Sequence, residues 1–274
     1  MTYFGFLAIF LVVPLVILFA LHLYDKRINR VLPTQWQSWH AWQVISVQAL
    51  IAVVYTTPWD NYLVATRTWW YNPGLVTGFL IGYVPIEEYT FFVLQTFLTG
   101  AFLLTLVRHR PIWGEQLKLG SPRWRWLITG ILAVIWFIFA LILIVGWKPG
   151  TYLGLLMVWA LPPLMLQTAF GVDILWKYRR YIVVTVVTMT LYLAFADMLA
   201  ITSGTWTIDP EQSLNIFILG KLPVEEFIFF FMTNMLVVVG VTLLSSTISR
   251  ERIINSWQVI KLRRKIDQHY ETSS

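Results

Sequence analysis

Seven long apolar stretches constrain this chain more than any other feature of its sequence. Most of them are long enough to cross the ~30 Å hydrocarbon core of a bilayer as a helix. The stretches are Tyr3–Leu23, Ala41–Thr57 (short), Ile86–Val107, Trp126–Trp147, Tyr152–Gly171, Tyr181–Thr202 and Val224–Leu244. The sequence therefore predicts an all-α polytopic membrane protein with seven transmembrane helices.

Composition supports this class and excludes others. Charged residues make up 12% of the chain, about half of the ~25% in a soluble domain, and a coiled-coil or disordered chain is excluded on the same ground. Cysteine is absent, which excludes disulfides, thiolate metal sites and cysteine nucleophiles. No basic residue precedes the first apolar stretch, so we expect a retained helix rather than a cleaved signal peptide.

The basic residues predict how the chain is oriented in the membrane. Seventeen of the 20 lysines and arginines fall in the first, third and fifth connections and the C-terminal tail, and three fall in the alternate connections. The positive-inside rule then places the N-terminus outside and the C-terminus in the cytoplasm. We therefore interpret the net charge of +6 as a topology signal and expect no nucleic-acid partner. In the tail, Ile253, Trp257 and Ile260 recur at helical spacing, which suits contact with anionic lipid.

The chain also contains an internal repeat, so that spans 1–3 and 5–7 read as two copies of one unit. The aligned features are Tyr3 and Tyr152, Pro14 and Pro163, Asp60 and Asp197, Trp69 and Trp206, and a Pro-x-Glu-Glu motif at 85–88 and 223–226. Span 4 is the extra crossing that gives both copies the same orientation, as in a parallel repeat. The predicted organisation is a first repeat (1–110), a linker with span 4 (111–149), a second repeat (150–246) and a basic cytoplasmic tail (247–274).

Acidic residues in or near membrane spans are costly, and they mark candidate functional sites. Six fall toward the predicted extracytoplasmic side: Glu87, Glu88, Glu225, Glu226, Asp60 and Asp197. A proline followed by glutamates is also ordinary helix-start chemistry, which the helix dipole favours. Because these acids have stayed in register between the copies while their flanks diverged, we favour a shared functional site.

Aromatic residues accompany the acids. In each copy two phenylalanines follow the two glutamates by one helical turn, so that carboxyl groups and aromatic faces share one helix surface. The candidate substrate-contacting aromatics are Trp69, Trp206, Phe91, Phe92, Phe229 and Phe230. We assign Pro85 and Pro223 a structural role at the helix starts, and we assign most other tryptophans to the membrane interface.

The motifs that the sequence lacks exclude several kinds of catalytic site. The four histidines map to the predicted cytoplasmic side, away from the acids, so we expect neither histidine catalysis nor a metal at this site. The sequence has no glycine-rich dinucleotide or phosphate loop, no aspartate-rich motif for a prenyl diphosphate, and no mid-membrane lysine in the last span for a retinal Schiff base. We therefore expect no cofactor.

An acid–base site that is lined by aromatic rings and buried in lipid suits the protonation of an alkene and the guidance of the resulting carbocation. A carboxylic acid in an apolar site stays neutral and can donate a proton. Aromatic faces stabilise a cation without trapping it. A dry pocket prevents water from quenching it.

At the duplicated Pro-x-Glu-Glu motif, the sequence resembles the integral-membrane lycopene cyclases, which occur as two-subunit enzymes in actinobacteria and as fused chains in archaea and fungi. The resemblance covers nearly the whole chain. It implies a redox-neutral isomerisation of the linear ψ-ends of lycopene to β-rings, which gives γ-carotene and then β-carotene.

The resemblance also implies roles for the six acids. Glu87 and Glu225 would be the first acid and base, Glu88 and Glu226 their hydrogen-bonded partners, and Asp60 and Asp197 the supporting carboxylates. Which repeat donates the proton, and whether the chain has one composite site or two half-sites, stays open.

Alternative functions also fit the residues. A cyclase that makes another ring type or acts on C50 carotenoids would carry the same motifs. A proton-coupled transporter would also combine repeats with intramembrane acids, although the other halves of the spans offer few polar residues for a pathway. In each case we expect a multi-pass protein of a prokaryotic cytoplasmic membrane. The cyclase would contact membrane lipid and a lipid-phase carotenoid, and contact with other carotenoid enzymes stays open.

Overall fold

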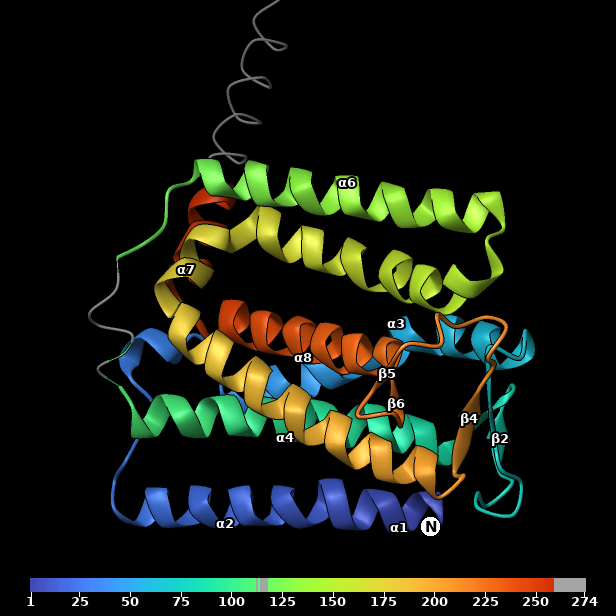
Figure 1. Cartoon of the computed structure of the whole chain (residues 1–274). Helices are drawn as coiled ribbons and strands as arrows, with labels where there is room; N and C mark the ends of the chain where they lie inside the picture. The colour runs from blue at the N-terminus through green and yellow to red at the C-terminus, as the bar shows by residue number, and fades with distance from the viewer. Residues whose placement is uncertain (112, 114–117, 259–274) are drawn as a thin grey trace, which may run out of the picture.

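The structure is a computed structural model, and it describes residues 1–111, 113 and 118–258 (Figure 1). Its helices are α1 (Tyr3–Leu7), η1 (Ala8–Val12), α2 (Val13–Arg27), η2 (Thr34–Trp36), α3 (Ala41–Ala65), α4 (Ile86–His109), α6 (Arg123–Val145), η3 (Lys148–Gly150), α7 (Thr151–Thr202) and α8 (Val224–Ser245). Its strands are β1 (Trp69–Tyr71), β2 (Leu80–Ile81), β3 (Val84–Pro85), β4 (Trp206–Ile208), β5 (Phe217–Ile218) and β6 (Leu222–Pro223).

Within these described ranges, six helical segments are long and apolar enough to cross a membrane. The molecule is therefore a predominantly helical protein of the predicted membrane class. Residues 259–274 of the predicted tail, Ile260 among them, and residues 112 and 114–117 of the linker lie outside the described residues.

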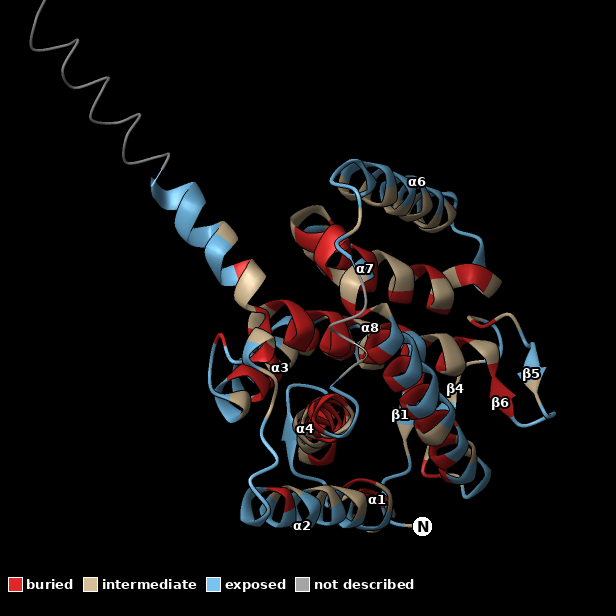
Figure 2. Cartoon of the chain, turned by 90° about the vertical axis from the view of Figure 1, so that its left-hand side faces the viewer, coloured by how far each residue is buried: buried red, intermediate tan, exposed pale blue. Residues whose placement is uncertain are grey.

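Helices α4 and α8 form the centre of the bundle. In two views a quarter turn apart, α2 and α6 lie on opposite sides, with α4, α7 and α8 between them (Figures 1 and 2). Buried residues concentrate on α4, α8 and the inward faces of α7, whereas α6 has none (Figure 2). Because α6 is apolar yet has no buried residue, its outer surface suits lipid rather than water.

Element α7 contains both predicted helices, which meet at a kink, and it differs from the prediction in the connection between them. The helix continues through residues 172–180, and Gly171 has a non-helical conformation (φ −151°, ψ 26°). A straight helix of 52 residues would be about 78 Å long, and α7 instead doubles back on itself (Figure 1). A Cβ atom at Gly171 would lie 2.5 Å from Leu243 Cδ2, so the bend needs a residue without a side chain where it meets α8.

Helix α3 is longer than predicted. The sequence predicts an end at Thr57, directly before Pro58, but the helix continues through this proline to Ala65. Proline costs a helix one hydrogen bond, and the side chain of Asn61 offsets that loss through one bond within α3 and one to the segment between β2 and β3. Asn61 donates to Thr57 O (2.9 Å) and accepts from the backbone N–H of Tyr83 (2.7 Å). The extension carries Asp60 into the bundle on the buried side of α3.

The short strands gather at one end of the bundle, which we call the strand end (Figure 1). Strands β1 and β4 pair antiparallel, with Trp70 opposite Thr207 at the centre of the register. Two hairpins, β2–β3 and β5–β6, lie directly before α4 and α8. Apolar side chains of both hairpins are exposed, including Phe79, Tyr83 and Leu219, and exposed apolar patches of this kind suit contact with lipid.

At the opposite end, the buried Asp173 of α7 joins three helical segments. Its carboxylate accepts hydrogen bonds from Arg125 of α6 (2.7 and 2.6 Å) and from Arg252 in the helical segment 247–258 (3.2 and 2.7 Å). We expect Asp173→Asn to lower the free energy of unfolding by about 2–4 kcal/mol, because two half-buried guanidinium groups lose their anion. Thermal denaturation of detergent-solubilised protein measures this, with the exposed Glu251→Gln as control. Equal midpoints for the two variants would contradict the expectation.

Candidate active site

The two Pro-x-Glu-Glu motifs start α4 and α8 in the same way. Pro85 and Pro223 are the N-cap residues of these helices and lie in extended conformation at the ends of β3 and β6. The next residue in each motif donates its backbone N–H across the hairpin, from Ile86 to Phe79 O and from Val224 to Ile216 O, both at 2.9 Å. The glutamates therefore fall in the first helical turn, and the hairpins hold both helix starts in place.

The first glutamate of each motif turns back toward its hairpin. Glu87 Oε1 accepts from the backbone N–H of Thr77, and Glu225 Oε1 accepts from that of Leu214, both at 2.6 Å. Both side chains are fully buried. Their contacts fasten the loop to the helix start, and neither residue lines the cavity described below.

The second glutamate of each motif contacts tyrosine hydroxyl groups. Glu88 Oε2 accepts hydrogen bonds from Tyr3 and, at 3.1 Å, from Tyr71. Glu226 Oε1 accepts from Tyr152 at 2.6 Å. The two glutamates of a motif thus have different partners, whereas the sequence predicts that they bond to each other.

The two aspartates are buried near these glutamates. Asp197 lines the cavity, and Trp206 forms a side-chain hydrogen bond with its carboxyl group. Asp60 lies behind the cavity, close enough to Glu88 for electrostatic interaction, and neither of its carboxyl oxygens has a hydrogen-bond partner among the described residues. A buried carboxyl group without partners is costly when it is charged, so Asp60 suits a neutral form.

Residues of the two halves of the chain meet around one small cavity at the strand end. The β1–β4 pair places Trp69 opposite Ile208 and Trp206 opposite Tyr71, at the two ends of the register. The cavity has a volume of about 40 Å³ and is lined by Tyr3, Phe6, Trp69, Tyr71, Glu88, Phe91, Tyr152, Asp197, Trp206, Ile208, Glu226, Phe229 and Phe230. This volume corresponds to a few water molecules. A larger group therefore needs the lining side chains to move.

Five of the six aromatic residues singled out from the sequence line this cavity. Phe91 and Phe230 meet edge to face, with ring centroids 6.2 Å apart, and Phe230 also contacts Phe229 at 5.2 Å. Phe92 is the exception, because it packs behind the cavity against Tyr89 and Phe91.

Sequence reasoning missed the tyrosines of this site. Tyr3 and Tyr152 align in the predicted repeat, and each donates a hydrogen bond to the second glutamate of its own half, Glu88 or Glu226, so their recurrence was the available signal. Tyr71 has no aligned tyrosine in the second copy. Burial, together with the nearby Asp60 and Glu88, raises the pKa of the Tyr71 hydroxyl well above its usual range. Tyr71 therefore remains a proton donor in hydrogen bonds to Glu88.

The arrangement can hold and transfer protons beside an apolar ligand. Within the described ranges, no group of three or more His, Asp or Glu side chains is placed to hold a metal ion. The bundle and its cavity define an integral-membrane helical protein in which carboxyl groups and aromatic faces share a site removed from water.

Comparison with known proteins identifies the family within this class. Lycopene β-cyclase of Halobacterium salinarum is 39% identical over 208 residues, which cover 76% of this chain and 84% of that protein. The chain belongs to the lycopene cyclase family.

Fungal relatives match over a similar part of the chain. The bifunctional lycopene cyclase/phytoene synthases of Gibberella fujikuroi and Aspergillus niger are 34% and 35% identical over 194 and 204 residues. The matches cover 69% and 72% of this chain, and about a third of each fungal protein. No family model matches the chain, and no solved structure matches it.

Proposed function

We propose that this chain is a lycopene β-cyclase, which converts the linear ψ-ends of lycopene to β-rings and gives γ-carotene and then β-carotene. The observation that carries the proposal is the placement of Glu88 and Glu226 on one aromatic-lined cavity. The names of the relatives support the substrate. The reaction needs only proton transfer, and it proceeds in a multi-pass membrane protein that takes its carotenoid from the lipid phase.

The proposed reaction begins when a neutral carboxyl group of the cavity protonates the terminal double bond of the ψ-end. The resulting tertiary carbocation is attacked by the next suitably placed internal double bond, which closes the six-membered ring and moves the positive charge into it. A carboxylate then removes a proton from the ring and forms the β-ring double bond. One proton is gained and one is lost, so the product is an isomer of the substrate.

We assign the acid and base roles to Glu88 and Glu226 rather than to Glu87 and Glu225. The second glutamates line the cavity, whereas the first glutamates hold backbone N–H groups of the hairpin loops. Tyrosine hydroxyls orient Glu88 and Glu226 and stabilise whichever of them is a carboxylate. Asp197 and Asp60 remain supporting carboxyls, and the proposal does not depend on which half donates the proton.

We further propose two copies of one unit and seven membrane crossings, with α7 crossing twice around its bend. The antiparallel β1–β4 register supports this, because it relates the halves about the central pair Trp70 and Thr207. Equivalent backbone bonds also recur: Tyr3 N–H donates to Leu75 O at 2.8 Å, and Tyr152 N–H donates to Gln212 O at 2.9 Å. With an outside N-terminus, the strand end is extracytoplasmic.

Single-cysteine labelling tests this topology, because the chain has no cysteine of its own. Glu211 and Glu251 are both exposed, near the strand end and at the opposite end respectively. We expect a membrane-impermeant maleimide to label Glu211→Cys in intact cells and Glu251→Cys only after permeabilisation. The reverse pattern, or labelling of both in intact cells, would contradict the proposed orientation.

Expression in bacteria that accumulate lycopene tests the proposed activity. Chromatography and absorption spectra of extracted pigments should show γ-carotene and β-carotene in place of lycopene. A differently placed ring double bond would correct the product, and cyclised C50 pigments in a suitable host would correct the substrate. Unchanged pigments with abundant membrane-inserted protein would refute the proposal.

A further inference from the structure

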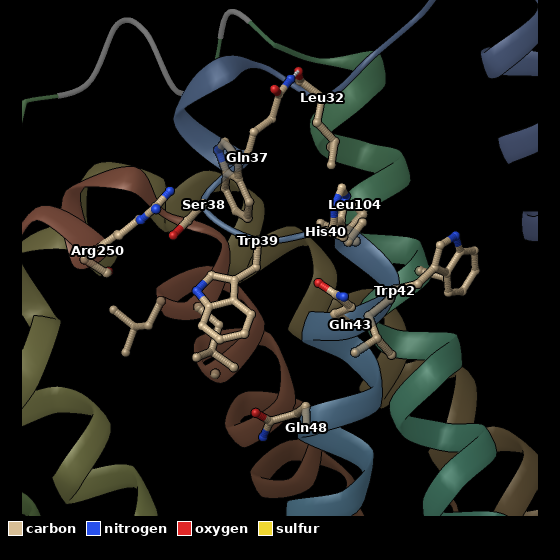
Figure 3. Close-up of a pocket in the computed structure, with 18 of the residues that line it drawn as sticks. Leu32, Gln37, Ser38, Trp39, His40, Trp42, Gln43, Gln48, Leu104 and Arg250 are labelled. Carbon is tan, nitrogen blue, oxygen red and sulfur yellow. Dashed lines mark hydrogen bonds between the residues drawn. The ribbon is translucent and has the colours of Figure 1, made fainter. Parts of the chain in front are cut away.

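A second and much larger cavity opens at the end of the bundle opposite the active-site cavity (Figure 3). We call it the end pocket. Its volume is about 1080 Å³, and it is lined by parts of α2, α3, α4, α7 and α8 and of the segments 28–40 and 247–258. Such a volume is at the upper end of the ~300–1,000 Å³ of ligand pockets. Its walls include Ile45 and Ile51 of α3, Leu166 and Phe170 of α7, and Gly240 of α8.

Most of the lining is apolar, and four basic residues also line the pocket: Lys26, Arg30, Arg108 and Arg250. Arg30 and Arg108 each lie 3.4 Å from a carboxyl oxygen of Asp25. Polar side chains such as Gln43 and Gln48 project from α3 along the pocket (Figure 3). The apolar walls of the pocket suit a hydrocarbon ligand.

A row of stacked rings connects this region with the active-site cavity. Beyond Ile51 on α3, Tyr55 and Trp59 follow at intervals of four residues and therefore lie on the same helix face. Tyr55 stacks on Trp159 of α7 (centroids 5.9 Å apart, planes at 24°), and Trp59 stacks on the same indole (4.4 Å, 18°). Trp59 also stacks on Phe229 (6.1 Å, 6°), which lines the active-site cavity.

The same two helices therefore touch at the aromatic row and enclose the end pocket beyond it. Two hydrogen bonds fix the touching point: Tyr55 OH donates to Trp159 O (2.9 Å), and Trp59 Nε1 donates to Leu155 O (3.0 Å). On α8, which packs against both α3 and α7, 14 residues separate Glu226 from Gly240. This corresponds to about 21 Å of helix. The pocket thus lies well away from the acids but along one continuous side of the bundle.

This distance matters because the proposed substrate is long, stiff and reactive at both ends. While one end lies at Glu88 and Glu226, the other end must be accommodated elsewhere. In the second cyclisation, the end that is already cyclised becomes the far end, and a ring is wider than a linear end. The end pocket, with a volume of about 1080 Å³, has room for a ring at the far end.

We propose that the end pocket holds the far end of the carotenoid, and that its width admits a ring and thereby permits the second cyclisation. This inference rests on the proposed function and adds a site that sets the number of rings. Between the two cavities the polyene runs alongside the aromatic row Tyr55–Trp159–Trp59–Phe229, whose rings contact one another.

Two variants from different helices narrow the end pocket. Ile51→Trp places a larger side chain on its wall. Gly240→Leu reduces the volume of the pocket from the side of α8. Even a Cβ atom there would lie 2.5 Å from Gln48 Oε1 and would push that side chain into the pocket. Leu50→Trp is the matched control, because Leu50 neighbours Ile51 on α3 and is 64% exposed but does not line the pocket.

The measurement is the conversion of lycopene and, separately, of supplied γ-carotene by membranes that contain equal amounts of each variant. Both pocket variants should convert γ-carotene about tenfold more slowly, as expected for overpacking of a fitted site. Their consumption of lycopene should fall less than their conversion of γ-carotene, because a linear far end is narrower than a ring, so that γ-carotene accumulates. The control should match the unchanged protein in both reactions.

The possible failures are distinguishable. Unchanged γ-carotene conversion by the folded Ile51→Trp variant would overturn the inference, and so would an equal loss of both reactions. If the wild-type protein stops at γ-carotene, the inference is overturned but the proposed cyclase activity stands. If the wild-type protein forms no ring from either substrate, both the proposed function and the inference are overturned.

Discussion

Replacing Glu226 with Gln should lower the rate of cyclisation at least a hundredfold, because general acid–base groups contribute about 10²–10⁴. Glutamine keeps the shape of the side chain and can still accept the hydrogen bond of Tyr152, but its amide neither donates nor accepts the catalytic proton. The same loss is expected for Glu88→Gln. Pigment analysis in lycopene-accumulating cells, normalised to the amount of membrane-inserted protein, measures both.

Glu225→Gln is the matched control for this prediction. Its amide oxygen can still accept from the backbone N–H of Leu214, so the loop stays in place and activity should fall less than about tenfold. Because Glu225 and Glu226 are both buried, a difference between their variants reports position at the cavity rather than burial. A severe loss for Glu225→Gln together with an active Glu226→Gln would reverse the assigned roles.

The two second-glutamate variants also distinguish one site from two. The hundredfold loss expected for each single variant is that of a composite site, which needs both residues for every ring. Two independent half-sites would leave one of them working in each single variant. About half of the activity would then remain, and only the double variant would be inactive.

Replacing Trp69 with Leu should slow cyclisation about tenfold to thirtyfold. Trp69 lines the cavity, and a desolvated cation over an aromatic face gains about 1.5–2 kcal/mol. The residue suits this test because its indole N–H has no hydrogen-bond partner among the described residues. The change therefore removes an aromatic face without breaking a hydrogen bond.

Trp69→Phe separates this electrostatic role from the filling of space. Phenylalanine keeps an aromatic face at the cavity, so the rate should stay within a few-fold of the unchanged protein. Single-turnover measurements in proteoliposomes at saturating lycopene would isolate the chemical step from substrate entry. Equal rates for Trp69→Leu and Trp69→Phe would show that no cation is stabilised at this ring.

The sequence identified most residues of the candidate site but not which of them has which role. Glu87 and Glu88 are adjacent, and neighbouring positions on a helix point about 100° apart. Which of them faces the cavity depends on where α4 lies against its neighbours. Tyr3 was visible as an aligned residue, but its contact with Glu88 joins positions 85 residues apart, and no local pattern reports such a contact.

The same limit explains the differences in the fold. A basic stretch at 172–180 resembles a connection, yet it remains helical because α7 bends at Gly171 against Leu243 of α8. Pro58 resembles a helix end, yet contacts from Asn61 let α3 continue. In both cases a tertiary contact outweighs a local propensity, which is worth only ~3 kcal/mol even for proline.

The sequence by itself determined the membrane class, the acids, most of the aromatic residues and their recurrence in two halves. These properties follow from the lengths of apolar runs and from spacings along the chain, so they can be predicted without knowing how the helices pack. Only the tertiary structure decided which glutamate faces the cavity, which tyrosines contact it and where the end pocket lies. Those properties depend on packing between helices that are distant in sequence, and the free energy of that packing is distributed over many contacts rather than encoded in any one segment.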